Sequence, residues 1–193
     1  MATGSGKTRT VIALADLLMQ MNWAKRILFL ADRVALVNQA VNAFKSHLPS
    51  ASIVNLIKDK NDEGRVYVST YPTMMGLIDG KTAGSRKFGV GHFDLIIIDE
   101  AHHLRNPSSQ THAIGPLFTK IAAYKMLLSA TPINLKNRDL FSLLRLIDRN
   151  TFADEDSLDE IIQANTPLMK AKDALSEGKG LEEIYDHVRT ASR

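Results

Sequence analysis

The chain alternates between short apolar runs and longer segments in which apolar residues recur at helical spacing. Leu95–Ile98 is the strongest run, with four aliphatic residues in succession. Continuous apolar runs of this length are typical of strands that are buried on both faces of a parallel sheet. The pattern therefore predicts strands at Ile27–Ala31, Ile53–Ile57, Val66–Ser69, Leu95–Ile98 and Lys125–Ser129.

The segments around these runs carry apolar residues every three or four positions, which predicts amphipathic helices. Strands that alternate with helices form βαβ units, in which both faces of a parallel sheet are covered by helices. We therefore expect an α/β fold with a doubly wound parallel sheet. The predicted helix faces are Val11, Leu14, Ala15, Leu18 and Met21; Val34, Val37, Val41, Phe44 and Leu48; and Leu140, Leu143, Leu144 and Ile147.

The last part of the chain has a different pattern, with helices only. We expect a domain at 1–150, followed by a short helical extension at 151–193. The acidic run Asp154–Glu160 predicts a helix start, because carboxylates favour the positive end of the helix dipole.

A second helix is predicted within this extension. Thr166 and Pro167 fit an N-cap and the first helical position. Gly178 or Gly180 is then expected to end that helix.

Upstream, Asp79–Gly91 contains four glycines and three basic residues. That composition favours a solvated loop over a DNA clamp.

The net charge of +3 conceals an asymmetry between the two parts. Residues 1–150 carry 19 Lys and Arg against 11 Asp and Glu, whereas residues 151–193 carry 5 against 10. The basic part suits a polyanionic partner. The sequence has no cysteine, which excludes disulfides and agrees with a cytoplasmic protein. No apolar stretch is long enough to span a bilayer.

The first residues of the chain match the later part of a Walker A loop, with Thr3, Gly4, Ser5, Gly6, Lys7 and Thr8. In such loops the backbone N–H groups surround phosphates at the start of a helix. Lys7 would reach the β- and γ-phosphates of ATP, and the Thr8 hydroxyl would ligate Mg²⁺. The full motif has a glycine where Met1 stands, so we expect an N-terminally truncated motif that lacks the preceding strand. The alternative is a Gly-Lys-Thr turn that occurs by chance.

A second motif, which is acidic, follows the strongest predicted strand. Asp99 and Glu100 come directly after Leu95–Ile98. A carboxylate at this place, next to a P-loop, holds Mg²⁺ in P-loop NTPases, so Asp99 is the predicted metal ligand. Glu100 beside it is the predicted general base for the attacking water. The alternative is an acidic strand end that caps the next helix.

Together these motifs resemble superfamily 2 helicases over about residues 1–150. Gly4–Thr8, Asp99–His102 and Ser129–Thr131 are similar to motifs I, II and III. Ala31–Arg33 with Gln39 resembles motif Ia, and Val68–Tyr71 resembles motif Ib. The resemblance implies a RecA-like P-loop NTPase domain that binds ATP, Mg²⁺ and DNA.

The resemblance also implies roles for further residues. His102, Ser129 and Thr131 would couple the ATP site to DNA. Arg33, Ser69 and Thr70 would contact DNA phosphates, or would instead have helix-capping or strand-end roles. A second RecA-like domain, expected to be missing from this chain, would complete the site with arginines.

Within the superfamily the resemblance is divided. Residues 2–102 are similar to the motor subunit of type I restriction enzymes, whereas residues 103–165 resemble Swi/Snf-type translocases. We therefore predict an ATP-dependent DNA helicase or translocase, within a restriction system and with restriction-modification subunits as candidate partners. The alternatives are a Swi/Snf-type remodeller of protein–DNA complexes and an inactive nucleotide-binding fragment. A small-molecule kinase is disfavoured by the Asp-Glu-Ala-His and Ser-Ala-Thr motifs.

Overall fold

The structure is a computed structural model that describes residues 6–60, 62–78, 87–104, 121–129 and 137–191. The chain forms two compact units, Met1–Ile147 and Asp148–Arg193. The first unit contains a parallel sheet flanked by helices, and the second contains two helices. Among the helices that the structure describes, none combines the length and apolar character that crossing a membrane requires.

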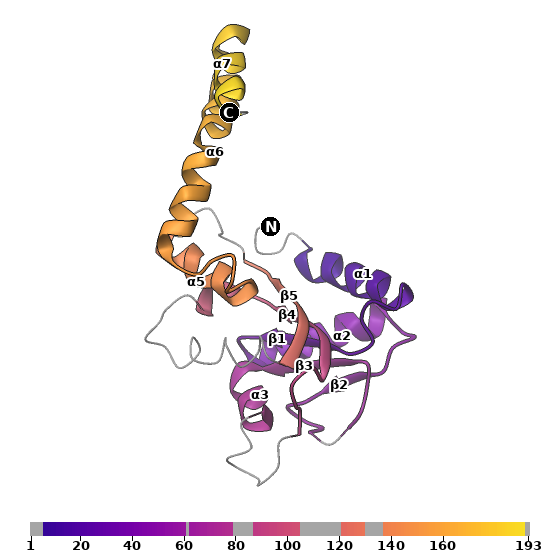
Figure 1. The fold of residues 1–193 in the computed structure, drawn as a ribbon. Helices are drawn as coiled ribbons and strands as arrows, with labels where there is room; N and C mark the ends of the chain where they lie inside the picture. The colour runs from indigo at the N-terminus through magenta and orange to yellow at the C-terminus, as the bar shows by residue number, and fades with distance from the viewer. Residues whose placement is uncertain (1–5, 61, 79–86, 105–120, 130–136, 192–193) are drawn as a thin grey trace. The chain divides into compact units, whose positions relative to one another are not determined.

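The sheet of the first unit has five parallel strands in the order β2-β3-β1-β4-β5 (Figure 1). Its central strand, β1, is fully buried because it has a neighbour on each side and helices above and below. The strands are β1 Ile27–Ala31, β2 Ile53–Asn55, β3 Val66–Thr70, β4 Phe93–Ile98 and β5 Ala122–Leu127. The predicted doubly wound α/β fold is confirmed.

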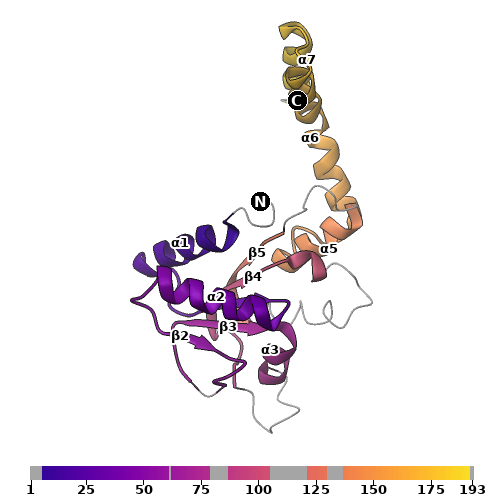
Figure 2. The same cartoon turned by 180° about the vertical axis from the view of Figure 1, so that it is seen from behind.

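Side chains alternate between the two faces of the sheet and form two hydrophobic clusters. Ile27, Phe29 and Ala31 of β1 join a cluster with α1 (Lys7–Gln20) and α2 (Val34–His47). Leu28 and Leu30 join the opposite cluster, with α3 (Tyr71–Ile78), the 3₁₀ helix η1 (Ala101–Leu104) and α5 (Asn137–Ile147). Figure 2, which views the molecule from behind, has α1 and α2 in front of the sheet. The strands are thus buried on both faces, as the apolar runs predict.

Several boundaries differ from the sequence prediction. Strand β3 ends one residue later than predicted, and β4 begins two residues earlier. The larger differences are in β2, which ends at Asn55 rather than at residue 57, and in β5, which spans Ala122–Leu127 rather than residues 125–129. These two strands form the edges of the sheet, where burial constrains the sequence least. Met21, predicted on the buried face of the first helix, is 62% exposed, because α1 ends at Gln20.

The second unit corrects a further prediction. Helix α6 runs without interruption over Glu155–Ser176, and Pro167 lies inside it rather than at its first position. The Thr166 hydroxyl donates a hydrogen bond to the Ile162 carbonyl at 2.9 Å, which is a mid-helix contact and not an N-cap. The predicted helix start at Thr166 and Pro167 is therefore wrong. The helix begins at Glu155, inside the acidic run that was also predicted as a helix start.

The end of α6 lies where Gly178 predicts it. Gly178 has φ +70°, a left-handed conformation that favours glycine. The Lys179 amide donates to the Ala174 carbonyl, and the Gly178 amide donates to the Leu175 carbonyl. This pair of bonds is the Schellman arrangement, and it satisfies the last carbonyls of the helix before α7 (Leu181–Ala191) begins.

Candidate nucleotide-binding site

The candidate site lies at the carboxyl ends of the parallel strands, where ligands bind in open α/β sheets. The register pairs Ala31 of β1 with Thr70 of β3, and Leu30 of β1 with Ile98 of β4. The residues that follow these three strands therefore lie at one edge of the sheet. They are Asp32, Tyr71 and Asp99.

The predicted phosphate loop leads into α1. Gly6 is the N-cap residue, with φ +83°, and its carbonyl accepts a hydrogen bond from the Thr10 amide. Only glycine adopts this left-handed conformation without cost. Lys7 and Thr8 occupy the first turn, whose N–H groups and positive dipole form an anion-binding environment. Thr3, Gly4 and Ser5 lie outside the described residues.

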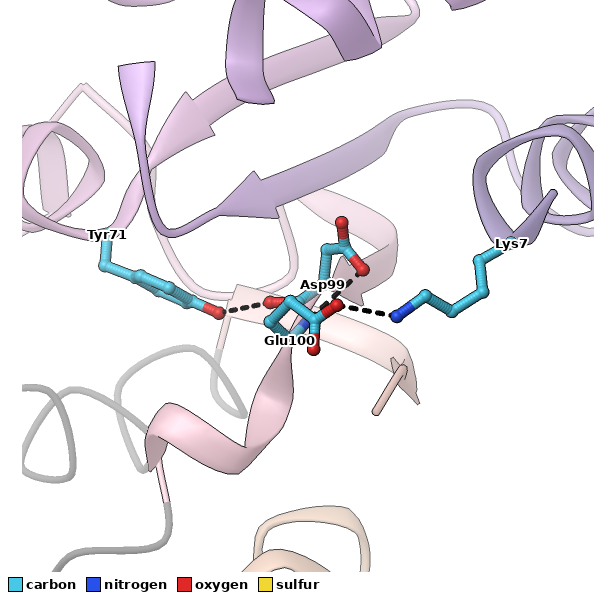
Figure 3. Close-up of polar contacts among 4 residues, drawn as sticks. All are labelled: Lys7, Tyr71, Asp99 and Glu100. Atoms are coloured by element: carbon cyan, nitrogen blue, oxygen red, sulfur yellow. Dashed lines mark hydrogen bonds and ion pairs between the residues drawn. The ribbon is translucent and has the colours of Figure 1, made fainter. Parts of the chain in front are cut away.

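An ion pair joins this loop to the predicted metal-binding motif. The Lys7 ammonium (Nζ) lies 2.6 Å from the Glu100 carboxylate oxygen Oε1, and Figure 3 shows the two side chains pointing toward each other. Only 10% of the Lys7 side chain and 17% of the Glu100 side chain are exposed. Ninety-three positions of sequence separate the two residues, so the fold brings the two motifs together.

Glu100 has a strained backbone. Its φ is +51°, a conformation that costs a residue with a side chain about 1–3 kcal/mol. Several hydrogen bonds hold the flanking peptides. The Asp99 amide donates to the Leu30 carbonyl at 2.9 Å, and the Ala101 amide donates to the Leu128 carbonyl at 2.7 Å. The Glu100 amide itself donates to the Asp99 carboxylate at 3.1 Å. The carboxylate of Glu100 is thus directed toward Lys7 by a conformation that the surrounding strands impose.

Tyr71 also contacts this motif, although the sequence assigned it no role of its own. Its hydroxyl donates a 2.8 Å hydrogen bond to the backbone carbonyl of Asp99. In Figure 3, Tyr71 and Lys7 approach the Asp99–Glu100 pair from opposite sides. The only sequence signal was its place in the motif Ib-like segment, directly after β3.

The predicted coupling residues lie only partly within the described part of the chain. The Leu128 amide donates to the Ile98 carbonyl at 2.9 Å, so β5 remains paired with β4 up to the residue before Ser129. This pairing brings the backbone of Ser129 next to the Asp99–Glu100 segment. His102 lies in η1, and Thr131 lies outside the described residues.

The three predicted DNA contacts differ in their surroundings. The Arg33 side chain is 78% exposed, at the N-cap position of α2, with its Nε 3.4 Å from the Asp32 carboxylate. Ser69 is fully buried and its hydroxyl donates to the Thr70 carbonyl at 3.1 Å. The Thr70 hydroxyl contacts the Thr73 side chain and accepts from the Thr73 amide, as an N-cap of α3 does. Arg33 is accessible to a phosphate in this structure, whereas Ser69 and Thr70 make hydrogen bonds that fit the alternative strand-end and helix-capping roles. Their contact with DNA stays a prediction.

Comparison with known proteins identifies the family of this chain. The family model described as "Type III restriction enzyme, res subunit" matches residues 1–134. The endonuclease subunit of the type I restriction enzyme EcoKI from Escherichia coli K12 is 31% identical over 154 residues, which are 68% of this chain and 13% of that subunit. The RNA polymerase-associated protein RapA of Vibrio campbellii is 35% identical over 95 residues, 47% of this chain and 10% of RapA. The chain thus spans only about an eighth to a tenth of the length of these relatives.

A solved structure has the same fold. The Sulfolobus solfataricus SWI2/SNF2 ATPase core, solved in complex with dsDNA, superposes with a TM-score of 0.65 at 17% identity, over 99% of this chain and 37% of that one. The predicted resemblance to the motor subunit of type I restriction enzymes is confirmed. The likeness to the SWI2/SNF2 core is one of fold, and the division of the resemblance at residue 103 stays a prediction. The chain belongs to the type III restriction enzyme res subunit family, whose RecA-like domain is that of superfamily 2 helicase- and translocase-type ATPases.

Proposed function

We propose that this domain binds ATP with Mg²⁺ and hydrolyses it to drive movement along DNA. The observation that carries the proposal is the 2.6 Å ion pair between Lys7 and Glu100. It brings the phosphate-loop lysine and the carboxylate that would activate water to one point at the carboxyl edge of the sheet. Lone Gly-Lys-Thr or Asp-Glu pairs occur by chance, but their convergence at a ligand-binding edge is the arrangement of P-loop NTPases.

The residues present fit the ligands. The Glu100 carboxylate is an anion that pairs with Lys7 at the start of a helix. A phosphate oxygen of ATP would be bound at the same place. In this proposal Lys7 binds the β- and γ-phosphates, and Thr8 and Asp99 hold the metal. Mg²⁺ would neutralise charge on the phosphate oxygens. Glu100, released from Lys7, would accept the proton of the attacking water.

We further propose that binding belongs to this domain and that fast turnover needs a second RecA-like domain. The resemblance implies that arginines of such a domain complete the site. In related NTPases an arginine finger contributes about 10³- to 10⁵-fold in rate. We therefore expect the 193-residue chain alone to bind ATP but to hydrolyse it slowly, with little stimulation by DNA.

Movement along duplex DNA is favoured over strand separation. The restriction subunit and RapA are relatives on the sequence side, and the matched SWI2/SNF2 core was solved with double-stranded DNA. A remodeller of protein–DNA complexes is the second candidate, because RapA is associated with RNA polymerase. In a motor that includes this domain, removal of a bound protein from duplex DNA without strand separation would favour the remodeller, and triplex displacement from bare duplex would favour translocation.

The direct test is binding of a fluorescent ATP analogue by the purified chain, with Mg²⁺ or with EDTA. Lys7→Ala should lower the affinity at least about tenfold, because it removes the charge on the phosphates. Lys45→Ala is the matched control, since Lys45 is exposed on α2, and it should bind as wild type does. Circular dichroism of both variants checks the fold. Binding that is absent at millimolar nucleotide, or that is equal in the Lys7 variant, would refute the proposal and leave an inactive domain as the better reading.

A further inference from the structure

We infer that Tyr71 is a positioning residue for the reaction, which holds the Asp99–Glu100 peptide in the conformation that directs Glu100 toward the phosphate loop. The inference rests on the proposed function, and it concerns a residue that the motifs do not assign. Two observations carry it: the reach of the side chain across the sheet, and the strain at the peptide it contacts.

Tyr71 reaches the motif from two strands away. Strands β3 and β4 both pair with β1 and lie on opposite sides of it, so the ends of β3 and β4 are separated by about twice the 4.8 Å strand spacing. Tyr71 follows β3, and its hydroxyl lies 2.8 Å from the carbonyl oxygen of Asp99, which follows β4. The side chain therefore crosses the end of β1. Such a span needs a long and rigid side chain with a polar end, which describes tyrosine.

The bond is made at the peptide that needs support. The Asp99 carbonyl belongs to the peptide between Asp99 and Glu100, and rotation of that peptide changes the φ of Glu100. That φ is +51°, so the relaxed backbone would turn the glutamate away from its present direction. A hydrogen bond from a fixed donor opposes this rotation. Tyr71 and Lys7 thus hold the segment from opposite sides, one at the backbone and one at the carboxylate (Figure 3).

Packing fixes the position of the Tyr71 side chain. The residue is 2% exposed and belongs to the cluster that includes Met74 and Ile98. The hydroxyl is therefore held in one place, within reach of the Asp99 carbonyl.

The chain provides a matched control in Tyr67. This tyrosine is 3% exposed, lies in β3, the strand that leads to Tyr71, and belongs to the same cluster. Its hydroxyl also makes one backbone contact, accepting from the Gly64 amide at 3.0 Å, but at the opposite end of β3. Tyr71→Phe and Tyr67→Phe therefore remove the same atom from equally buried rings. They differ in whether the lost bond supports the Asp99–Glu100 peptide.

Two measurements decide the inference: hydrolysis by a motor that includes this domain, and amide exchange in the purified chain. Single-turnover hydrolysis, with protein in excess over ATP, isolates the chemical step from binding. Loss of one neutral hydrogen bond predicts a rate about 3- to 10-fold lower in Tyr71→Phe than in wild type. The ATP affinity and the Tm of Tyr71→Phe should not differ from those of Tyr67→Phe or of wild type. Amide hydrogen exchange by NMR should be faster at Glu100 and Ala101 in Tyr71→Phe, and faster at Gly64 in Tyr67→Phe.

The results separate this inference from the proposed function. A Tyr71→Phe variant with a wild-type rate and wild-type exchange at residues 99–101 would overturn the positioning role. So would a lower rate that is matched by an equal loss in Tyr67→Phe, since any buried hydroxyl would then serve. If wild type fails to bind ATP, the proposed function fails. Faster exchange at Glu100, confined to the Tyr71 variant, would still establish that Tyr71 holds the peptide.

Discussion

Replacement of Glu100 by glutamine should have two opposite effects on the ATP reaction. The substitution keeps the size of the side chain and removes its negative charge. The proposed general base is lost, so hydrolysis slows. At the same time Lys7 loses the carboxylate at 2.6 Å with which it is paired, so a phosphate no longer competes with that carboxylate for the lysine. We therefore expect slower turnover together with tighter ATP binding.

The magnitudes follow from the chemistry and from the burial of the pair. A positioned general base contributes about 10²- to 10⁴-fold in rate. A hydrogen bond to a charged partner contributes about 1.5–3 kcal/mol, against about 1 kcal/mol for a neutral one. Because both side chains are more than four-fifths buried, solvent screens this difference little. About 1 kcal/mol of competition would be removed in Glu100→Gln, which corresponds to an ATP affinity about fivefold higher.

The assay uses a motor that includes this domain and compares wild type, Glu100→Gln and Glu63→Gln, in which an exposed glutamate is changed in the same way. Titration of a fluorescent ATP analogue gives the affinity, and single-turnover phosphate release gives the chemical rate. The Glu63 variant should match wild type in both. Near-normal hydrolysis by Glu100→Gln would refute the role of Glu100 as base. Weaker ATP binding in that variant would refute the idea that the ion pair competes with the phosphates.

Three further predictions concern backbone conformation and DNA. Gly6→Ala and Gly178→Ala should each lower the free energy of unfolding by about 1 kcal/mol, because both glycines have positive φ and open space around an added Cβ. Only Gly6→Ala should weaken ATP binding, and equal binding in both variants would contradict the phosphate-loop assignment. Arg33→Ala should reduce the slope of log affinity for DNA against log salt by about one unit, if this exposed side chain neutralises one phosphate; an unchanged slope would assign Arg33 to the start of α2 alone. In a Lys7→Ala background, Glu100→Gly should be about 1 kcal/mol more stable to urea than Glu100→Ala, the reverse of the usual order in ordered structure, because φ at this position is +51°. Equal stability of these two variants would show that the backbone relaxes when the carboxylate is removed.

Much of the fold could be predicted because the buried strands have a simple local signature. A parallel strand covered on both faces has no polar alternation, so Ile27–Ala31 was predicted with its observed bounds. The edge strands carry a weaker signal. In β5, Ala123 and Tyr124 are exposed, so the apolar pattern indicated only the second half of the strand. The order of the strands is set by packing between distant segments and has no local signature.

The helical unit shows how a local motif can mislead. Threonine followed by proline is a common way to begin a helix, yet Thr166 and Pro167 lie in the middle of α6. Proline in a helix interior removes one hydrogen bond and costs about 3 kcal/mol. Other residues of α6, namely Leu158, Ala171 and Ala174, are buried, and α7 packs along α6. Tertiary packing of this kind offsets a local cost that sequence alone weighs too heavily.

The candidate site was predictable where its chemistry is contiguous in sequence and hidden where it is not. Lys7 and Glu100 were both found, because each belongs to a short motif with a known mechanism. The contact between Tyr71 and Asp99 was missed, because it depends on β3 and β4 lying on opposite sides of β1. A tyrosine after a strand has many structural uses, and only the strand order shows which carbonyl it reaches.

The strained glutamate links these observations. Within the described residues, the non-glycine positions with positive φ are Asn22 and Glu100. Asn22 lies in the turn after α1, where asparagine adopts this conformation readily. Glu100 has no such local reason, and glycine would relieve the strain at that position. A glutamate is present there despite the cost of its backbone conformation. Hydrogen bonds from Tyr71 and to the neighbouring strands restrain its peptides, and Lys7 restrains its side chain. Strain that the surroundings maintain is typical of functional sites, and here it places the acid group where the proposed reaction requires a base.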